Sequence, residues 1–228
     1  MVFAAGLGTR MGVLTRDRPK PLIEVAGRPL IDHALALARE AGIERIVVNS
    51  HAHADQLEAH LAAQAAEVSV SHEPILLETG GGLLAARPLL ETGTAFTLNA
   101  DMVWTGVNPL AALTRCWPKA REQGARAVLC LVPRDAAIGH SGPGDFFRGP
   151  EGRLTRRGNA EQADFVFSGA QILDLSVLDG FAPGAFSLNL VWDRLLADKA
   201  LFGIVHRGGW VDVGTPEGIA LAEAELAR

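Results

Sequence analysis

Apolar and polar positions follow two different periods along this chain of 228 residues. Short apolar runs are typical of buried strands, and they occur at 45–50, 66–72, 95–101, 127–132, 164–173 and 200–206. Segments of helical length, with apolar residues at helical spacing, lie between several of these runs, at 29–42, 54–65 and 82–90. The alternation predicts an α/β fold with a mostly parallel, doubly wound, Rossmann-like sheet whose two faces are both covered by helices.

The order of elements becomes less regular after Pro133. The segment 139–159 is rich in glycine and charge, which predicts hairpins with a long loop. Because open parallel sheets bind ligands at the carboxyl ends of their strands, we expect this irregular half to shape the pocket of a second substrate. The length suits a single domain over residues 1–228, and the sequence contains no internal repeat.

Composition narrows the classes of ligand. The formal net charge of −5 gives the chain no general attraction for nucleic acid or an anionic membrane, so local groups must hold any phosphate that it binds. Its two cysteines, Cys116 and Cys130, form no CxxC pair and predict neither a disulfide framework nor a zinc site. The sequence has no signal peptide, membrane-spanning stretch or lipidation motif. We therefore expect a soluble cytoplasmic protein, with a few native residues trimmed before the abrupt start at Met1.

The first residues, MVFAAGLGTRM, predict a strand that ends in a glycine-rich loop. The loop is no Walker P-loop, because no lysine followed by serine or threonine comes after the glycines. It also departs from the dinucleotide fingerprint GxGxxG, since Met11 stands where the third glycine belongs. Successive backbone N–H groups from Gly6 to Arg10 can form an anion-binding concavity, to which the Arg10 guanidinium adds a bidentate contact. An ordinary glycine-rich turn with a solvated arginine is the alternative.

The motif RPKPL holds Lys20 between two prolines. Pro19 and Pro21 fix their own φ and push the residues before them towards extended backbone, so the lysine is presented at low entropic cost. This clamp favours a functional lysine. A semi-rigid loop with a solvated lysine is the alternative.

Carboxylates follow two apolar segments far apart in the sequence. Asn99 and Asp101 stand at the carboxyl end of a predicted strand, where a doubly wound sheet places its ligands. Asp212 lies in the short apolar segment WVDV, just before a last helix that we expect to begin near Pro216. Mg²⁺ takes one or two protein carboxylates and fills its other positions with water and phosphate oxygens, so two aspartates would suffice. The alternatives are a turn-forming or capping role for Asp101 and a helix cap for Asp212.

The motif AAGLGTRM…LT…RPKPLIEVAGRPLID resembles the N-terminal signature of sugar-1-phosphate nucleotidylyltransferases. The motifs LLETGGGL, LNADMVW, GDF, FSG and WVDVGTPE also follow in the order of that family, so the resemblance covers nearly the whole chain. The short bacterial N-acetylmuramate-1-phosphate uridylyltransferases are the most similar group, and mannose-1-phosphate guanylyltransferases come next. Gly12 and Val13 stand where the family usually has Arg-Pro, which removes one auxiliary cation near the triphosphate.

The resemblance implies that a phosphate oxygen of a sugar 1-phosphate attacks the α-phosphorus of a nucleoside triphosphate and that pyrophosphate leaves. It implies Mg²⁺ as cofactor, these two small molecules as partners, no nucleic acid or membrane, and a place in the recycling of cell-wall sugars. The catalytic residues it implies are Lys20, Arg10 and Asp101, and the metal ligands are Asp101 and Asp212. The nucleotide-binding residues are Ala5, Gly6, Leu7, Gly8, Thr9, Arg10, Lys20, Glu78 and Gly81, and the sugar-binding residues are Asn99, Asp145 and Gly169.

The identity of the base depends on Glu78, which precedes three glycines that let a ring approach the backbone. Guanine offers adjacent N–H and NH₂ donors to a carboxylate, whereas uracil offers a single ring N–H between two carbonyl groups. We predict UTP with N-acetylmuramate 1-phosphate from the whole-chain resemblance, and GTP with mannose 1-phosphate is the alternative. A non-catalytic nucleotide-sugar sensor and a nicotinamide-dependent oxidoreductase are alternatives of other classes.

Overall fold

The computed structural model describes residues 1–63 and 68–228. Its α-helices are α1 (Leu30–Glu40), α2 (Ala54–Ala62), α3 (Glu78–Leu90), α4 (Pro109–Glu122), α5 (Leu188–Ala197) and α6 (Pro216–Leu226). Its strands are β1 (Val2–Phe3), β2 (Glu24–Val25), β3 (Arg28–Pro29), β4 (Ile46–Ser50), β5 (Val68–His72), β6 (Thr94–Asn99), β7 (Met102–Trp104), β8 (Ala127–Pro133), β9 (Phe146–Arg148), β10 (Leu154–Arg156), β11 (Phe165–Asp174), β12 (Leu201–Val205) and β13 (Trp210–Asp212).

The main sheet runs in the order β10-β9-β11-β6-β1-β4-β5, and β8 joins it beside β11 with β12 beside β8. Strand β1 is parallel to β4 and β6, β4 is parallel to β5, and β8 is parallel to β12. Strand β11 runs antiparallel to both β6 and β8, so it joins two parallel parts into one mixed sheet. The predicted α/β class with a mostly parallel sheet is confirmed, and the antiparallel strands β9, β10 and β11 are the part that departs from it.

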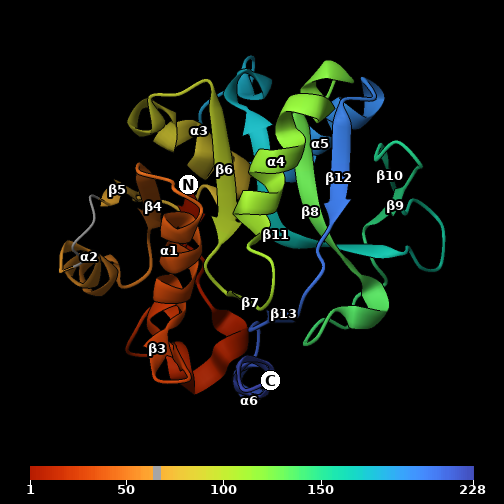
Figure 1. Cartoon of the computed structure of the whole chain (residues 1–228). Helices are drawn as coiled ribbons and strands as arrows, with labels where there is room; N and C mark the ends of the chain where they lie inside the picture. The colour runs from red at the N-terminus through yellow and green to blue at the C-terminus, as the bar shows by residue number, and fades with distance from the viewer. Residues whose placement is uncertain (64–67) are drawn as a thin grey trace.

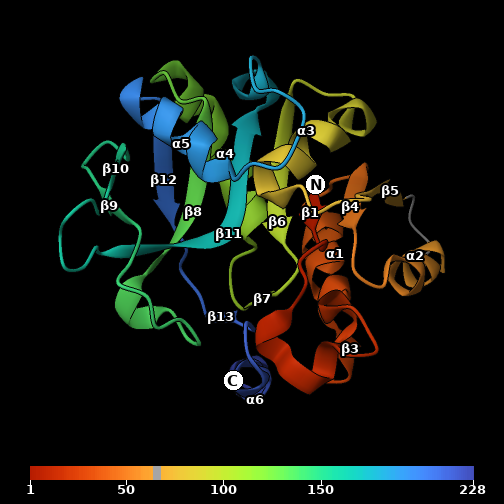
Figure 2. The same cartoon turned by 180° about the vertical axis from the view of Figure 1, so that it is seen from behind.

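Helices cover the sheet on both faces (Figures 1 and 2). Helices α1 and α4 pack on one face through buried residues such as Leu35 and Leu113, which belong to one apolar cluster. Helices α3 and α5 pack on the other face through residues such as Leu83 and Val191, in a second cluster. Burial of apolar surface on both sides explains why the central strands read as nearly continuous apolar runs.

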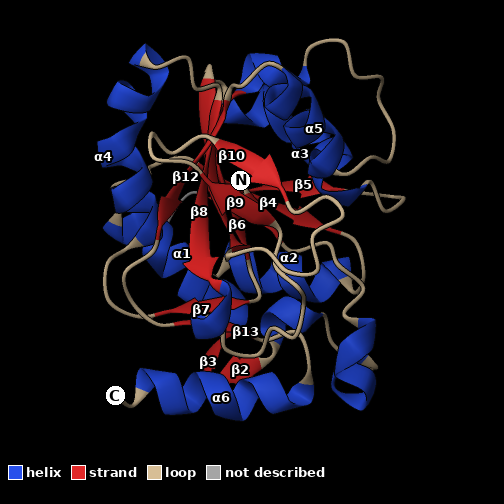
Figure 3. Cartoon of the chain, turned by 90° about the vertical axis from the view of Figure 1, so that its right-hand side faces the viewer, coloured by secondary structure: helices blue, strands red, loops and turns tan. Residues whose placement is uncertain are grey.

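A third and smaller apolar core lies beyond the carboxyl ends of the central strands. Strands β7 and β13 form a separate two-stranded sheet, and α6 runs beside it and beside the β2–β3 hairpin (Figure 3). Met11, Val103, Val211 and Ala222 are buried together there. This core joins the first loop of the chain to its last helix. The β7–β13 sheet within it begins directly after Asp101 and ends at Asp212.

The predicted strand at the first residues is β1, and the six other predicted strands correspond to β4, β5, β6, β8, β11 and β12. Positions 66 and 67 of the predicted run 66–72 lie outside the described residues. Helices α1, α2 and α3 occupy the predicted helical segments. The end of the predicted helix 54–65 lies outside the described residues. The irregular half contains the antiparallel β9–β10 hairpin, as predicted, and α6 begins at Pro216. Helix α3 begins at Glu78, earlier than its predicted start, so the three glycines lie inside its first turns. Within the described residues, no helix is both long and apolar enough to cross a membrane.

Candidate active site

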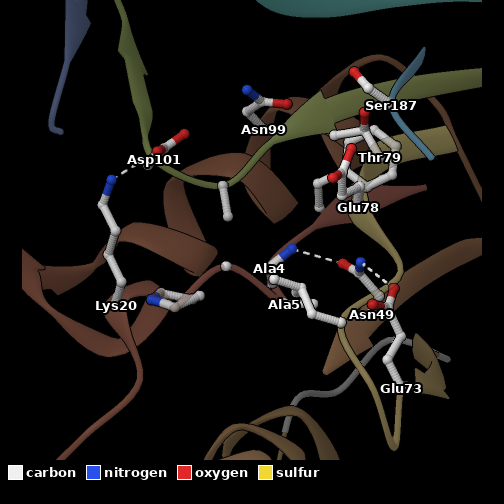
Figure 4. A pocket seen from close by; sticks show the side chains of 15 residues that line it. Ala4, Ala5, Lys20, Asn49, Glu73, Glu78, Thr79, Asn99, Asp101 and Ser187 are labelled. Atoms are coloured by element: carbon white, nitrogen blue, oxygen red, sulfur yellow. Dashed lines mark hydrogen bonds and ion pairs between the residues drawn. The ribbon is translucent and has the colours of Figure 1, made fainter. Parts of the chain in front are cut away.

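Two cavities meet at the carboxyl ends of β1 and β6. The first, of about 380 Å³, is lined by the loop after β1, by the segment around Glu78 and by Lys20 and Asp101 (Figure 4). The second, of about 350 Å³, is lined by the irregular half and by Asp212. Four residues line both cavities: Phe3, Thr79, Asn99 and Ser187. Two ligands could therefore bind side by side and touch at the shared wall.

The Lys20 side chain forms an ion pair with Asp101, with Nζ donating to Oδ2 at 2.6 Å. Pro19 precedes the short 3₁₀ helix Lys20–Leu22 in extended conformation, and Pro21 occupies its first turn, as the clamp predicts. Gly8 has a positive φ of 63°, and a Cβ there would lie 2.9 Å from Lys20 Cβ. Glycine is therefore required at Gly8 for both conformation and space. Lys20 is only 8% exposed, which removes the solvated-loop alternative.

Asp212 enters the site through the pairing of two distant strands. It stands opposite Met102 in the β7–β13 ladder, and its backbone N–H donates to the Ile138 carbonyl at 2.9 Å. The next backbone N–H, of Val213, donates to the Asp101 carbonyl at 3.0 Å. These bonds hold the backbones of the two aspartates together. Asp212 ends a strand and does not cap α6, whose N-cap residue is Thr215.

The charged form of the Asp212 carboxylate is destabilised by its surroundings. It is 9% exposed, and its buried Oδ1 has no hydrogen-bond partner within the described residues. Burial raises the pKa of Asp212 above its usual range, the negative charge of Asp101 raises it further, and Lys20 and Arg10 oppose the rise. A buried carboxylate that repels its neighbour is a group that a cation would stabilise.

These two carboxylates fit a divalent cation of the magnesium type. Their oxygens are hard ligands, and Asp212 Oδ1 lacks a partner within the described residues. Asp101 lines the first cavity and Asp212 lines the second. The described residues contain no cluster of three histidine, cysteine or acidic side chains that could hold a metal. Two carboxylates suit an ion that completes its shell with water and phosphate oxygens, because Mg²⁺ keeps several non-protein ligands.

The Arg10 guanidinium lies beside the same aspartate. A Cβ at Gly214 would lie 2.8 Å from Arg10 Nη1 and 2.9 Å from Asp212 Oδ1, so both groups face this glycine. Of the predicted loop, Ala5 and Gly6 line the first cavity. Leu7, Gly8 and Thr9 lie outside its lining, and Gly8 acts through its contact with Lys20.

A buried polar chain that sequence reasoning missed supports the first cavity. The Ala4 N–H donates to Asn49 Oδ1 at 2.7 Å, and Asn49 Nδ2 donates to Glu73 Oε1 at 2.7 Å (Figure 4). The second Glu73 oxygen accepts from the Leu77 N–H at 3.0 Å. Glu73 is 1% exposed, so its carboxylate joins the loop after β1 to the segment before α3. The available signal was Asn49 at the carboxyl end of an apolar strand.

Gly81, predicted to bind the nucleotide, makes close contacts with the protein backbone in the structure. The N–H groups of Gly80 and Gly81 donate to the Phe186 carbonyl at 2.8 and 3.0 Å, and a Cβ at Gly81 would clash with the Gly184 carbonyl. The backbone that approaches these glycines is therefore that of residues 184–186, which holds α3 against the start of α5. Glu78 does line the first cavity, and its φ of 58° is unusual for a residue with a side chain.

The three predicted sugar-binding residues lie around the second cavity. Asn99 lines both cavities, and Asp145 lines the second, where its Oδ2 accepts from the Phe167 N–H at 2.8 Å. Gly169, at a bulge in β11 with φ 87°, is not part of the lining. A Cβ there would lie 3.0 Å from Asn99 Cβ and 3.1 Å from Met102 Cγ. Gly169 therefore leaves room for Asn99 behind the cavity wall.

Known proteins resemble this chain along its whole length. The family model of the MobA-like NTP transferase domain matches residues 1–140. The N-acetylmuramate alpha-1-phosphate uridylyltransferase of Caulobacter vibrioides is 39% identical over 236 residues, covering 100% of this chain and 96% of that protein. The protein of the same name from Neisseria meningitidis serogroup B is 33% identical, covering 94% of this chain and 92% of its own length.

A solved structure shares the fold. UDP-glucose pyrophosphorylase in complex with UDP-glucose superimposes with a TM-score of 0.79 and covers 99% of this chain and 97% of its own. Its sequence identity is 17%, so this likeness establishes the architecture alone.

Proposed function

Because this chain belongs to the family with a MobA-like NTP transferase domain and is a sugar-1-phosphate nucleotidyltransferase, we propose that it transfers uridylyl from UTP to N-acetylmuramate 1-phosphate. The observation that carries the proposal is the convergence of Lys20, Asp101 and Asp212 where the two cavities meet. The triphosphate would occupy the first cavity and the sugar the second. The product would be the nucleotide sugar, in keeping with a cytoplasmic role in recycling cell-wall sugars.

The reaction depends on alignment of the two phosphate substrates, and it needs no general base. The phosphate oxygen of the sugar 1-phosphate is already ionised, so it attacks the α-phosphorus without first losing a proton, and pyrophosphate leaves opposite to it. The protein must bring two anions together and stabilise the charge that spreads over the α-phosphoryl oxygens. Lys20 Nζ, which lies in the first cavity beside Asp101, would contact those oxygens, and Arg10, which lies beside Asp212, would hold the neighbouring phosphates.

Mg²⁺ held by Asp101 and Asp212 would supply charge neutralisation between the two reactants. Asn49 and Glu73 would keep the loop after β1 and the segment before α3 in fixed positions around the nucleotide. Asp145 would accept hydrogen bonds from sugar hydroxyls, because its second oxygen is already anchored on the backbone.

A second candidate function is transfer of guanylyl to mannose 1-phosphate. It is favoured by Glu78, whose side chain lines the first cavity and could accept both donors of guanine. We favour uridylyl transfer, because relatives of that name are 39% and 33% identical over nearly the full length.

A two-by-two assay of the purified chain tests the proposal. UTP and GTP are each combined with N-acetylmuramate 1-phosphate and mannose 1-phosphate, and pyrophosphate release is measured with Mg²⁺ present. The expected result is the highest kcat/KM for UTP with N-acetylmuramate 1-phosphate. A tenfold preference for GTP with mannose 1-phosphate would assign guanylyl transfer and give Glu78 the role of recognising guanine.

A further inference from the structure

The second cavity contains a cation that the transfer reaction does not use. Among the described residues that line it, Arg156 and His140 are the side chains that can carry positive charge. His140 lies close enough to Asp212 to affect its charge state, so it belongs to the end where the phosphates meet. Arg156 comes from the β9–β10 hairpin of the irregular half.

The Arg156 guanidinium is held in a fixed plane. It stacks on the rings of Phe146 and Trp192, with 4.9 and 5.7 Å from Cζ to the ring centroids. Its Nε and Nη2 donate to Asp193 Oδ1 at 3.0 and 2.8 Å, and Nη2 also reaches the Asn189 carbonyl at 3.3 Å. Within the described residues, Nη1 donates to no group. The side chain is 31% exposed, so one edge of a pre-oriented guanidinium remains available.

Arg156 is positioned next to the predicted sugar-binding carboxylate. It stands opposite Phe146 in the hairpin register, and the following N–H, of Arg157, donates to the Asp145 carbonyl at 2.9 Å. Asp145 and Arg156 thus present an acceptor and a donor of opposite charge in one cavity. A sugar that carries only hydroxyls needs no cation at such a place, whereas a sugar with a carboxylate does.

N-Acetylmuramate carries a carboxylate on its lactyl ether, which N-acetylglucosamine lacks. We propose that Arg156 binds this lactyl carboxylate and is the residue that selects the acidic sugar. The proposal rests on the proposed function. A guanidinium fixed by two rings and one carboxylate loses little conformational entropy on binding a second carboxylate, and charge-assisted hydrogen bonds are strong. Asp193 balances the charge of Arg156 before the sugar arrives.

The test compares N-acetylmuramate 1-phosphate, the acid, with the neutral compound in which the lactyl carboxylate is a methyl ester. For wild type with UTP, we expect kcat/KM to fall at least about tenfold when the carboxylate is esterified, the loss expected for a charged hydrogen bond. For Arg156→Gln, we expect the same loss with the acid, carried mainly by KM, and little further loss with the ester. Arg156→Lys keeps the charge and should recover part of the preference for the acid.

Arg153→Gln is the matched control, because Arg153 also stacks on a ring, that of Phe202, but lies outside the lining of the cavity. It should keep the wild-type preference for the acid. Equal losses of Arg156→Gln on acid and ester, or no loss at all, would overturn the role of Arg156 while leaving uridylyl transfer intact. Failure of wild type to use the acid with UTP would instead overturn the proposed function itself. Melting temperatures of the variants separate loss of selectivity from loss of fold.

Discussion

The ammonium nitrogen of Lys20 lies 2.6 Å from Oδ2 of Asp101, although the two residues are 81 positions apart in the chain. The pair brings a cation into direct contact with a carboxylate that we propose as a metal ligand. Asp212 lies close enough for its charge to interact with both. Because a carboxylate has two oxygens, Asp101 could keep Lys20 on Oδ2 and offer its other oxygen to the cation.

The first prediction concerns Lys20. Lys20→Met keeps the stem that packs on Gly8 and removes the charge, so the variant should fold. A positioned charge acts on the transition state, and we expect kcat to fall at least about a hundredfold. Steady-state pyrophosphate release gives kcat, and the melting temperature checks the fold. Lys119→Met, on the exposed side of α4, should retain wild-type turnover. Near-normal turnover of Lys20→Met would contradict the role given to this lysine.

The second prediction concerns the two aspartates as one unit. Asp101→Asn and Asp212→Asn each remove a negative ligand at nearly constant size, so each should lose most of the Mg²⁺-dependent activity. If both carboxylates hold one ion, the double variant should be scarcely worse than either single variant. Titration of Mg²⁺ or Mn²⁺ in the pyrophosphate assay measures the effect. Fully additive losses of activity would show that the two residues act independently.

The third prediction follows from the raised pKa of Asp212, which has its ordinary value of 3.8 in the unfolded chain. The folded protein holds this proton more tightly, so the contribution of Asp212 to stability is largest below pH 3.8, falls as pH rises through the interval between the unfolded and folded pKa values, and stays lower above it. Without metal at pH 7, Asp212→Asn should therefore melt at a higher temperature than wild type. Each kcal/mol corresponds to roughly 2–4 °C in a chain of this size.

Thermal melting with a chelator, from pH 3.5 to pH 8, measures this difference. The advantage of Asp212→Asn should shrink towards pH 3.5, where most of Asp212 is protonated in both states. Added Mg²⁺ should raise the melting temperature of wild type and leave that of the variant nearly unchanged, because binding to the folded state alone stabilises it. A variant less stable than wild type at pH 7 without metal would contradict the electrostatic strain at Asp212.

Local chemistry explains why part of the site could be predicted from sequence. The prolines beside Lys20 restrict the backbone whatever the tertiary structure, and Asp101 follows an apolar run whose strand character is strong. The end of a parallel strand is a place for ligands in any open α/β sheet. These signals lie within a few residues of each functional group, so they can be read without knowledge of distant contacts.

Contacts between distant segments could not be predicted in this way. The β7–β13 ladder pairs Met102 with Asp212, and nothing local in either short segment specifies the partner. The glycine at position 81 does not indicate which segment of the chain packs against it, and in the structure this is the backbone of residues 184–186. Helix α4 lay outside the predicted segments. It contains Pro118, which weakens a helix in isolation, and packing of Leu113 on the sheet holds it in the fold.

The fourth prediction concerns Gly169, where an added side chain would have two effects. It would press on Asn99, and it would strain the backbone. In Gly169→Ala, the new Cβ would lie 3.0 Å from Asn99 Cβ and 3.1 Å from its Cγ, so Asn99 must move at the wall shared by the two cavities. The φ of 87° adds strain that any side chain would feel. We expect KM for the sugar 1-phosphate to rise several-fold, because a displacement of about 1 Å at a binding residue is costly.

Gly158→Ala is the control for the strain term. Gly158 also has a positive φ, of 55°, but a Cβ there meets no atom within 4 Å among the described residues. Both variants should therefore lose stability, on the order of 1 kcal/mol or more, in thermal melting, and only Gly169→Ala should change KM for the sugar. KM for the nucleotide should change less in Gly169→Ala, because the Ala4–Asn49–Glu73 hydrogen bonds that support the first cavity do not involve Asn99. Equal effects of the two substitutions on KM for the sugar would mean that Gly169 acts through the stability of β11 and not through Asn99.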